Sequence, residues 1–155
     1  VVAVHRHDGP HRGFACAEVA ALDARSEDPA ARIRELSGGR GADIVFNTVG
    51  SPYFAAANQA LAKGGTQIFI ATVERPVPFD IFTFYRGMHT YVGIDTLALD
   101  AAATAERFDA LHDGMQAGTL QPFPVQASGV YALADARDAY RRVLAGADER
   151  IVFHP

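Results

Sequence analysis

The sequence has one cysteine, no initial methionine, no excess of basic residues and no long apolar run. Cys16 has no second thiol with which to form a disulfide or a cysteine-rich zinc site, which fits a reducing compartment and predicts a cytoplasmic protein. The 14 basic and 18 acidic side chains give a net charge of −4, which disfavours a nucleic-acid partner. No membrane segment or signal peptide is expected. Because strand-like sequence begins at Val1, we expect a piece of a longer polypeptide.

With 49% apolar and 21% charged residues, the chain can bury one core, as a compact domain or as part of a larger one. Apolar runs rich in β-branched residues predict strands at residues 1–4, 18–23, 43–47 and 67–70. Helical patterns separate the later runs. Strand, helix and strand at this spacing are typical of right-handed crossovers in a parallel sheet with helices on both faces, so we expect an α/β fold.

Capping residues mark the ends of the predicted helices. Asp28-Pro29 pairs a side-chain acceptor with the residue best tolerated in a first helical turn, and it predicts a helix that Ser37-Gly38-Gly39 ends. Ser51-Pro52 repeats this pair ahead of a predicted helix at residues 53–62. Gly64-Gly65 would end that second helix, because glycine accepts the left-handed conformation common at helix C-termini.

The second half of the chain opens with an aromatic-rich segment. Residues 79–94 follow two prolines and predict a loop or short helix that leads into a strand. Apolar residues spaced by three and four predict amphipathic helices further on. The remaining predicted elements are helices at residues 12–17, 101–116 and 133–144, an extended segment at 120–130, and strands at 91–95 and 151–153.

Several stretches resemble the C-terminal half of the medium-chain dehydrogenase/reductase superfamily, in its quinone oxidoreductase and zinc-binding dehydrogenase group. They are GGRGADIVFNTVG at residues 38–50, ALAKGG at 60–65, VYALADA at 130–136 and IVF at 151–153. The resemblance implies strands two to six of a nucleotide-binding Rossmann domain over residues 1–118. It also implies that residues 119–155 are the C-terminal return of the chain into the catalytic domain.

The resemblance also shows what is missing. No Gly-x-Gly-x-x-Gly turn occurs, so the first strand–helix unit of the doubly wound sheet is absent. Since the strand order of that fold is 3-2-1-4-5-6, its loss would leave strands two and four with unpaired edges. We therefore expect a fragment, or a chain whose sheet is rearranged or completed by a partner, and no activity from this chain alone.

Ligands of a doubly wound sheet bind at the carboxyl ends of its strands, so the loops there are the candidate cofactor site. His5-Arg6 stands where an NAD-specific protein usually has an acidic residue, and a guanidinium suits a 2′-phosphate, which favours NADP(H) over NAD(H). The resemblance assigns Asn47-Thr48-Val49-Gly50 to the ribose and nicotinamide side of the cofactor. Ala71-Thr72 would let the nicotinamide come close, and Arg150 lies where the family often has a basic residue near the cofactor.

Each assignment has a simpler structural alternative. His5-Arg6 can be a solvated strand end, Asn47 to Gly50 a strand-to-helix loop, Ala71-Thr72 small-residue packing, and Arg150 an ordinary exposed arginine. No metal site is expected, because the histidines are scattered or lie in a predicted loop without cysteine partners. No catalytic triad or carboxylate pair is recognisable, so no catalytic side chain is assigned.

By this resemblance, the parent protein is an NADPH-dependent oxidoreductase that transfers hydride to a quinone or an α,β-unsaturated carbonyl. Two alternatives stay open: a fragment of a zinc-dependent alcohol dehydrogenase, and a non-catalytic nucleotide-binding or dimerisation module. The aromatic segment can line a substrate pocket, but core and dimer interface are favoured. The family pairs the strand equivalent to residues 89–95, from His89 to Asp95, across a two-fold axis, which predicts a homodimer.

Overall fold

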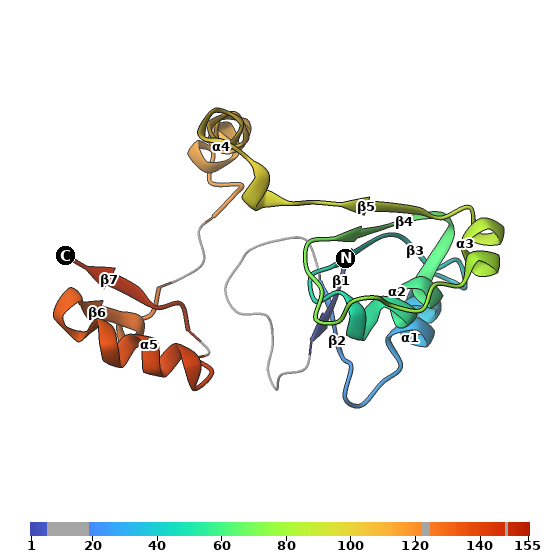
Figure 1. Cartoon of the computed structure of the whole chain (residues 1–155), viewed down its shortest axis with the longest axis horizontal. Helices are drawn as coiled ribbons and strands as arrows, with labels where there is room; N and C mark the ends of the chain where they lie inside the picture. The colour runs from blue at the N-terminus through green and yellow to red at the C-terminus, as the bar shows by residue number, and fades with distance from the viewer. Residues whose placement is uncertain (6–18, 122–124, 148) are drawn as a thin grey trace. The chain divides into compact units, whose positions relative to one another are not determined.

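The computed structural model describes residues 1–5, 19–121, 125–147 and 149–155 (Figure 1). The described chain divides into a larger unit that reaches Ala105 and a smaller unit that begins at Glu106. The helix expected at residues 12–17 lies outside the described residues. No described helix combines the length and apolar character needed to cross a membrane.

The larger unit contains a three-stranded parallel sheet in the order β3-β4-β5. Its strands are β3 (Ala42–Asn47), β4 (Leu61–Phe69) and β5 (Thr90–Gly93). Helix α2 (Phe54–Ala60) connects β3 to β4, and helix α3 (Ile81–Gly87) connects β4 to β5. Parallel strands joined through helices confirm the α/β class that the alternating pattern predicts.

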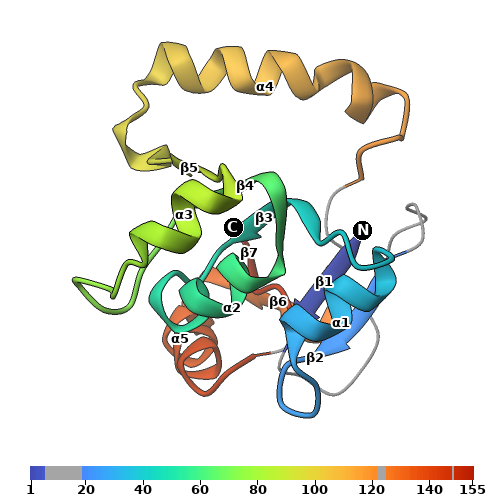
Figure 2. The same cartoon turned by 90° about the vertical axis from the view of Figure 1, so that its right-hand side faces the viewer.

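A second parallel sheet pairs β1 (Val2–His5) with β2 (Ala20–Asp23). Helix α1 (Pro29–Leu36) follows β2, and Figure 2 shows it beside α2. Among the described residues, β1 pairs with β2 alone and β3 pairs with β4 alone. No described strand joins these two sheets, which is the arrangement expected for a doubly wound order without its first strand.

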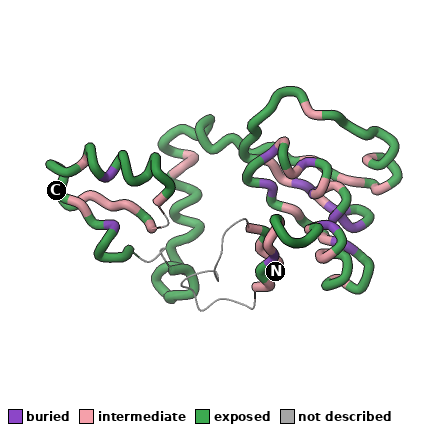
Figure 3. Tube along the Cα trace, turned by 90° about the horizontal axis from the view of Figure 1, so that it is seen from below, coloured by how far each residue is buried: buried purple, intermediate pink, exposed green. Residues whose placement is uncertain are grey.

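The core of the larger unit lies on the α2 side of the three-stranded sheet. Most of the buried residues belong to this unit (Figure 3), and those on α2 and the start of β4 are Phe54, Ala57, Ala60, Leu61 and Ala62. Alternate residues of a strand point to opposite faces. Ile44 and Phe46 on β3 are 64% and 56% exposed, so the other face of the sheet is open to solvent.

The first helix begins and ends where the capping residues predict. The Asp28 carboxylate accepts hydrogen bonds from the backbone N–H of Ala30, at 2.9 Å, and of Ala31, while Pro29 opens the helix. At the other end, the backbone N–H of Gly39 donates to Arg34 O at 2.7 Å. Both predicted helix ends are confirmed.

The predicted ends of the second helix are wrong. Residues 51–53 form a 3-10 turn without a side-chain cap, and the Ser51 hydroxyl instead accepts a hydrogen bond from the backbone N–H of Glu74 at 2.9 Å. Helix α2 ends at Ala60, and Gly64-Gly65 lies inside β4. The reason is strand contact, since a Cβ on Gly65 would lie 2.9 Å from the backbone oxygen of Ala42 in the neighbouring strand.

The smaller unit contains most of α4 (Ala101–Gln116) and a parallel pair of short strands, β6 (Val130–Ala132) and β7 (Val152–His154). Helix α4 has the predicted bounds, but its apolar residues are exposed. Helix α5 (Ala136–Leu144) connects β6 to β7 and begins later than predicted, because residues 133–135 form a 3-10 turn. Residues 127–129 form another 3-10 turn within the segment expected to be extended.

Candidate cofactor edge and aromatic pocket

The loop after β3 is built around a buried amide. The Asn47 side chain is 5% exposed, and its Oδ1 accepts hydrogen bonds from the backbone N–H of Val49 at 3.2 Å and of Gly50 at 2.8 Å. Its Nδ2 donates to Gly50 O at 3.0 Å. Because all three bonds are local, the Asn47 side chain shapes the loop, and Thr48 and Val49 are the exposed residues that the loop presents.

Gly50 brings the loops after β3 and β4 together. Its φ of +88° lies in the left-handed region, and a Cβ there would fall 2.2 Å from Ala71 O and 2.5 Å from Thr72 Cα. Only glycine therefore fits without displacing the neighbouring backbone. The structure places Asn47 to Gly50 and Ala71-Thr72, two of the segments singled out in the sequence, in direct contact at the carboxyl edge of the sheet.

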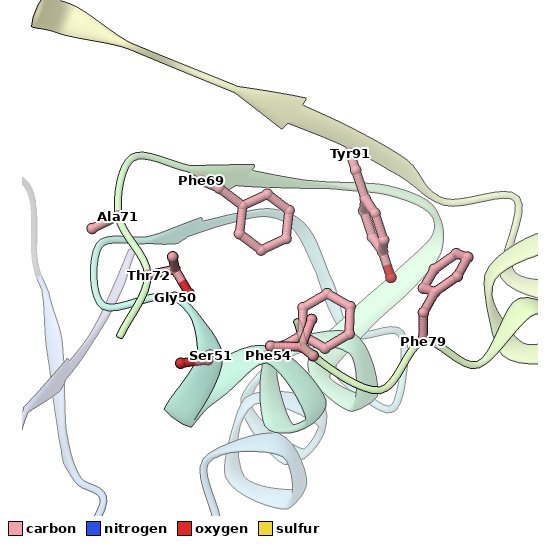
Figure 4. Close-up of a pocket in the computed structure, with 9 residues that line it drawn as sticks. Gly50, Ser51, Phe54, Phe69, Ala71, Thr72, Phe79 and Tyr91 are labelled. Carbon is pink, nitrogen blue, oxygen red and sulfur yellow. The ribbon is translucent and has the colours of Figure 1, made fainter. Parts of the chain in front are cut away.

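A pocket of about 510 Å³ adjoins this contact (Figure 4). In Figure 4, the residues from the two loops gather at one side, while aromatic rings from α2, β4, β5 and the loop before α3 converge at the other. None of the lining side chains is charged. The lining residues are Gly50, Ser51, Phe54, Phe69, Ala71, Thr72, Val77, Phe79 and Tyr91.

Tyr91 is the centre of the aromatic cluster. Its ring centroid lies 5.8 Å from that of Phe54, 5.6 Å from Phe69, 5.8 Å from Phe79 and 4.9 Å from Phe84. Three of these contacts have the edge-to-face geometry that aromatic rings prefer. Phe79 is 47% exposed, and Phe84 and Tyr91 are half-buried, so this aromatic segment lies beside the buried core, and Phe79 and Tyr91 form a pocket wall. Its role in a dimer interface stays a prediction.

A polar chain runs behind the pocket. The Tyr91 hydroxyl donates to Asn58 Oδ1 at 2.7 Å, and Gln67 Nε2 donates to the same oxygen at 3.4 Å. Burial raises the pKa of the Tyr91 hydroxyl, so it stays protonated at neutral pH. Gln67 is fully buried, and its Oε1 has no hydrogen-bond partner among the described residues.

Sequence reasoning missed Asn58, Gln67 and the aromatic residues outside the 79–94 segment that line the pocket. A signal was present for the two polar residues, since each interrupts an otherwise apolar strand or alanine-rich helix. A buried polar group in such a position usually has a hydrogen-bond partner. Nothing in the sequence marks Phe54 and Phe69 as neighbours, because their contact depends on the packing of α2 on β4.

At the end of β1, His5 is half-buried and lies opposite Asp23 in the strand register. The guanidinium of Arg25 hydrogen-bonds the Asp23 carboxylate, with its closest contact at 2.7 Å, and lowers the pKa of that carboxyl from its usual 3.8 to about 2. Arg6 lies outside the described residues. The binding roles of His5 and Arg6 stay predictions, and Arg25 is a described cation near the same strand ends that the sequence reasoning missed.

Arg150 is exposed and lies in the smaller unit, two residues before β7. Its backbone oxygen would lie 2.4 Å from a Cβ placed on Gly129, so the two chain segments approach each other closely there. This contact is between backbones and leaves the role of the Arg150 side chain a prediction.

The loop residues at the carboxyl edge fit the uncharged half of a nicotinamide dinucleotide. Thr48, Val49, Ala71 and Thr72 are exposed, small or apolar, and uncharged. The sequence holds no glycine-rich turn to receive a pyrophosphate. No three His, Cys, Asp or Glu side chains gather as a possible metal ligand set in the part of the chain that the structure describes.

Parallel strands, crossover helices and touching loops at the carboxyl edge define a doubly wound α/β nucleotide-binding fold. The family model described as zinc-binding dehydrogenase matches residues 17–112. The chain belongs to this family, and the predicted membership of the medium-chain dehydrogenase/reductase superfamily is confirmed. A comparison with curated proteins gives no significant match.

Solved structures share the fold. A mycobacterial protein solved in complex with NADPH is 27% identical, with a TM-score of 0.67 over 90% of this chain and 44% of that one. A quinone oxidoreductase of Pseudomonas syringae pv. tomato DC3000 is 24% identical, with a TM-score of 0.67 over 88% and 42%. An NAD-dependent alcohol dehydrogenase is 23% identical, with a TM-score of 0.68 over 88% and 38%. The chain spans less than half of each of these proteins.

Proposed function

We propose that this chain supplies the nicotinamide-facing edge of an NADPH-dependent oxidoreductase that transfers hydride to a quinone or an α,β-unsaturated carbonyl. The observation that carries the proposal is the contact between Gly50 and Ala71-Thr72, which joins two strand-end loops into one uncharged surface. Family membership and the NADPH-bound structural neighbour support it. Because the chain spans less than half of its structural neighbours, the activity is proposed for the whole protein.

Each residue of this edge has a positioning role in the proposal. The Asn47 amide fixes the loop so that Thr48 and Val49 face the cofactor. Gly50 and Ala71 have little or no side chain, so the backbone allows a flat ring to come close. When bound, the cofactor supplies the hydride. The protein's part is to hold donor and acceptor together and to exclude water with the apolar pocket beside this edge.

We propose NADPH over NADH as the preferred cofactor, and this preference rests on His5-Arg6. A guanidinium can hold a 2′-phosphate through two hydrogen bonds. We propose the cytoplasm as the location, because the single cysteine fits a reducing compartment.

Thermal unfolding of the whole protein with each cofactor tests the proposal. A ligand that binds only the folded state raises the unfolding midpoint, so NADPH should raise it more than NADH at equal concentration. Arg6→Ala should lower the NADPH shift and leave the NADH shift unchanged, whereas Arg40→Ala, at an exposed arginine on another loop, should change neither. A larger shift with NADH would refute the NADPH preference. No shift with either cofactor would refute the oxidoreductase proposal and favour a non-catalytic module.

A further inference from the structure

We propose that the aromatic pocket between α2, β4, β5 and the loop before α3 binds the fused rings of an aromatic quinone. This inference rests on the proposed function and chooses between its two substrate classes. Aromatic rings form the inner wall of the pocket, and its volume of about 510 Å³ lies within the usual range for small-molecule sites. A flat ring system can contact these rings through its faces and edges, whereas an open-chain enone offers a much smaller apolar surface.

The charge and hydrogen bonding of the lining residues indicate a neutral ligand and the orientation in which it binds. The uncharged lining favours a neutral molecule, because an ion would lose its hydration without gaining a partner. The Tyr91 hydroxyl already donates its proton to Asn58 Oδ1, so the inner wall offers a carbonyl no donor from this group. The fused rings of the quinone, and not its carbonyl groups, therefore lie against the inner wall.

The opposite side of the pocket can receive the quinone oxygen. Ser51 Oγ accepts the backbone N–H of Glu74 at 2.9 Å, and its own proton can be donated to a carbonyl oxygen. Ser51 lies beside Gly50, Ala71 and Thr72, the residues proposed to face the nicotinamide (Figure 4). The substrate's reducible end would thus lie on the cofactor side of the pocket.

The pocket wall formed by the loop before α3 is held in place. Besides the bond from Glu74 N to Ser51, the Thr72 hydroxyl donates to Glu74 O at 2.8 Å. Phe79 at the end of this loop contacts Phe84 on α3, with ring centroids 5.3 Å apart. The cavity is therefore bounded by fixed segments on both sides, which lowers the ordering cost of binding.

The test is a titration of the whole protein with 2,3-dimethyl-1,4-naphthoquinone, whose substituted ring does not alkylate Cys16, and with the open-chain enone 3-penten-2-one. Val77→Trp fills the pocket and should weaken quinone binding by about tenfold or more, equivalent to about 1.4 kcal/mol. Val73→Trp is the matched control, because Val73 is 70% exposed on the same loop and does not line the pocket. The quinone should bind more tightly than the enone to the unmodified protein.

A second pair of variants removes contact instead of adding bulk. Phe79→Ala should weaken quinone binding, and Phe82→Ala, at a 64% exposed ring on α3 outside the pocket, should not. The inference is overturned if the quinone fails to bind, if Val77→Trp binds it as tightly as the unmodified protein, or if NMR signals of Phe79 and Tyr91 respond to protein dilution instead of quinone, which would indicate a second copy in the pocket.

NADPH binding, followed in the same samples, separates the inference from the proposed function. NADPH-induced stabilisation without quinone binding would refute the pocket assignment and leave the oxidoreductase proposal standing. Quinone binding that is sensitive to Val77→Trp, without any NADPH response, would support the pocket and refute the cofactor assignment.

Discussion

Gly50 is the residue on which the proposed edge most depends, because it combines a positive φ with contact against backbone. Gly50→Ala should lower the free energy of unfolding by about 2–3 kcal/mol, from left-handed strain and the displaced 71–72 backbone. Gly64→Ala, at φ +79° with no atom near the added Cβ, should cost only the strain, about 1–2 kcal/mol. Gly93→Ala, with free space and no positive φ, should be near neutral.

Urea unfolding of the three variants checks this ranking. Equal losses for the Gly50 and Gly64 variants would show that the close contact between the two loops has no energetic weight. That result would refute the joined edge formed by the two loops.

The carboxyl of Asp23 gives a prediction for pH. Because Arg25 lowers its pKa in the folded protein from 3.8 to about 2, this pair stabilises the fold above pH 3.8, and that stabilisation is lost as the pH falls from 3.8 towards 2. Carboxyl NMR titration should give a midpoint near 2. Arg25→Ala should raise it towards 3.8.

Asp80 provides the control for this titration. Its pKa is lowered by the hydroxyl of Thr83, so Arg25→Ala should leave its titration unchanged. A midpoint of Asp23 that stays near 2 without Arg25 would show that the guanidinium is not the cause.

Sequence reasoning at the residue scale succeeded where the chemistry is local. The loop from Asn47 to Gly50 was identified from its place after an apolar strand, and its hydrogen bonds span at most three residues. Asn58 and Tyr91 are separated by 33 positions in the sequence. Their hydrogen bond forms because α2, which carries Asn58, packs on β4, the strand that pairs with β5. A contact between residues so far apart in the sequence has no signature in the local sequence pattern.

Among the elements, α1 depends on its N-terminal cap. Asp28→Ala removes the acceptor for the backbone N–H groups of Ala30 and Ala31 and should lower the free energy of unfolding by about 1 kcal/mol. Glu27→Ala, one residue earlier, removes only a 3.7 Å ion pair with Arg32 and should cost about 0.5 kcal/mol or less. Equal effects in urea unfolding would mean that charge near the helix start, and not the cap, is responsible.

Helix ends were predictable where capping decides them and unpredictable where packing does. Asp28-Pro29 and the glycines after Ser37 act within one turn, and the structure confirms them. Gly64-Gly65 has the same local signature, yet it lies within β4, because the strand passes too close to Ala42 for a side chain at Gly65. Glycine is suited both to a helix C-terminus and to a close contact between strands, so the sequence alone predicted a helix end where the structure has a strand.

At the scale of the molecule, the larger unit holds two parallel sheets, and among the described residues β1 and β3 each lie at an unpaired edge of one of them. Parallel sheets are normally continuous and covered on both faces, and unpaired apolar edges promote association. We propose that one further parallel strand joins β1 to β3 in the whole protein. That order follows from the doubly wound topology.

The outer edge of β5 is the place where we propose that two copies meet, as expected for the segment 89–95. Ile94 N donates to Phe69 O on β4, so in this parallel ladder the alternate residues Tyr91 and Gly93 direct their backbone N–H groups to the open side. Gly93→Pro removes one outward donor and leaves the bonds to β4 intact, and a Cβ there meets no atom within 4 Å.

Sedimentation equilibrium of the whole protein should therefore show a dimer that Gly93→Pro weakens by about tenfold or more, equivalent to about 1.4 kcal/mol. Gly93→Ala keeps the donor and should dimerise like the unmodified protein. A monomer, or equal dimerisation by the proline variant, would refute pairing through β5. Because Gly93 does not line the pocket and is not among the residues proposed to face the cofactor, NADPH stabilisation should survive in both variants, which separates loss of the dimer from loss of the fold.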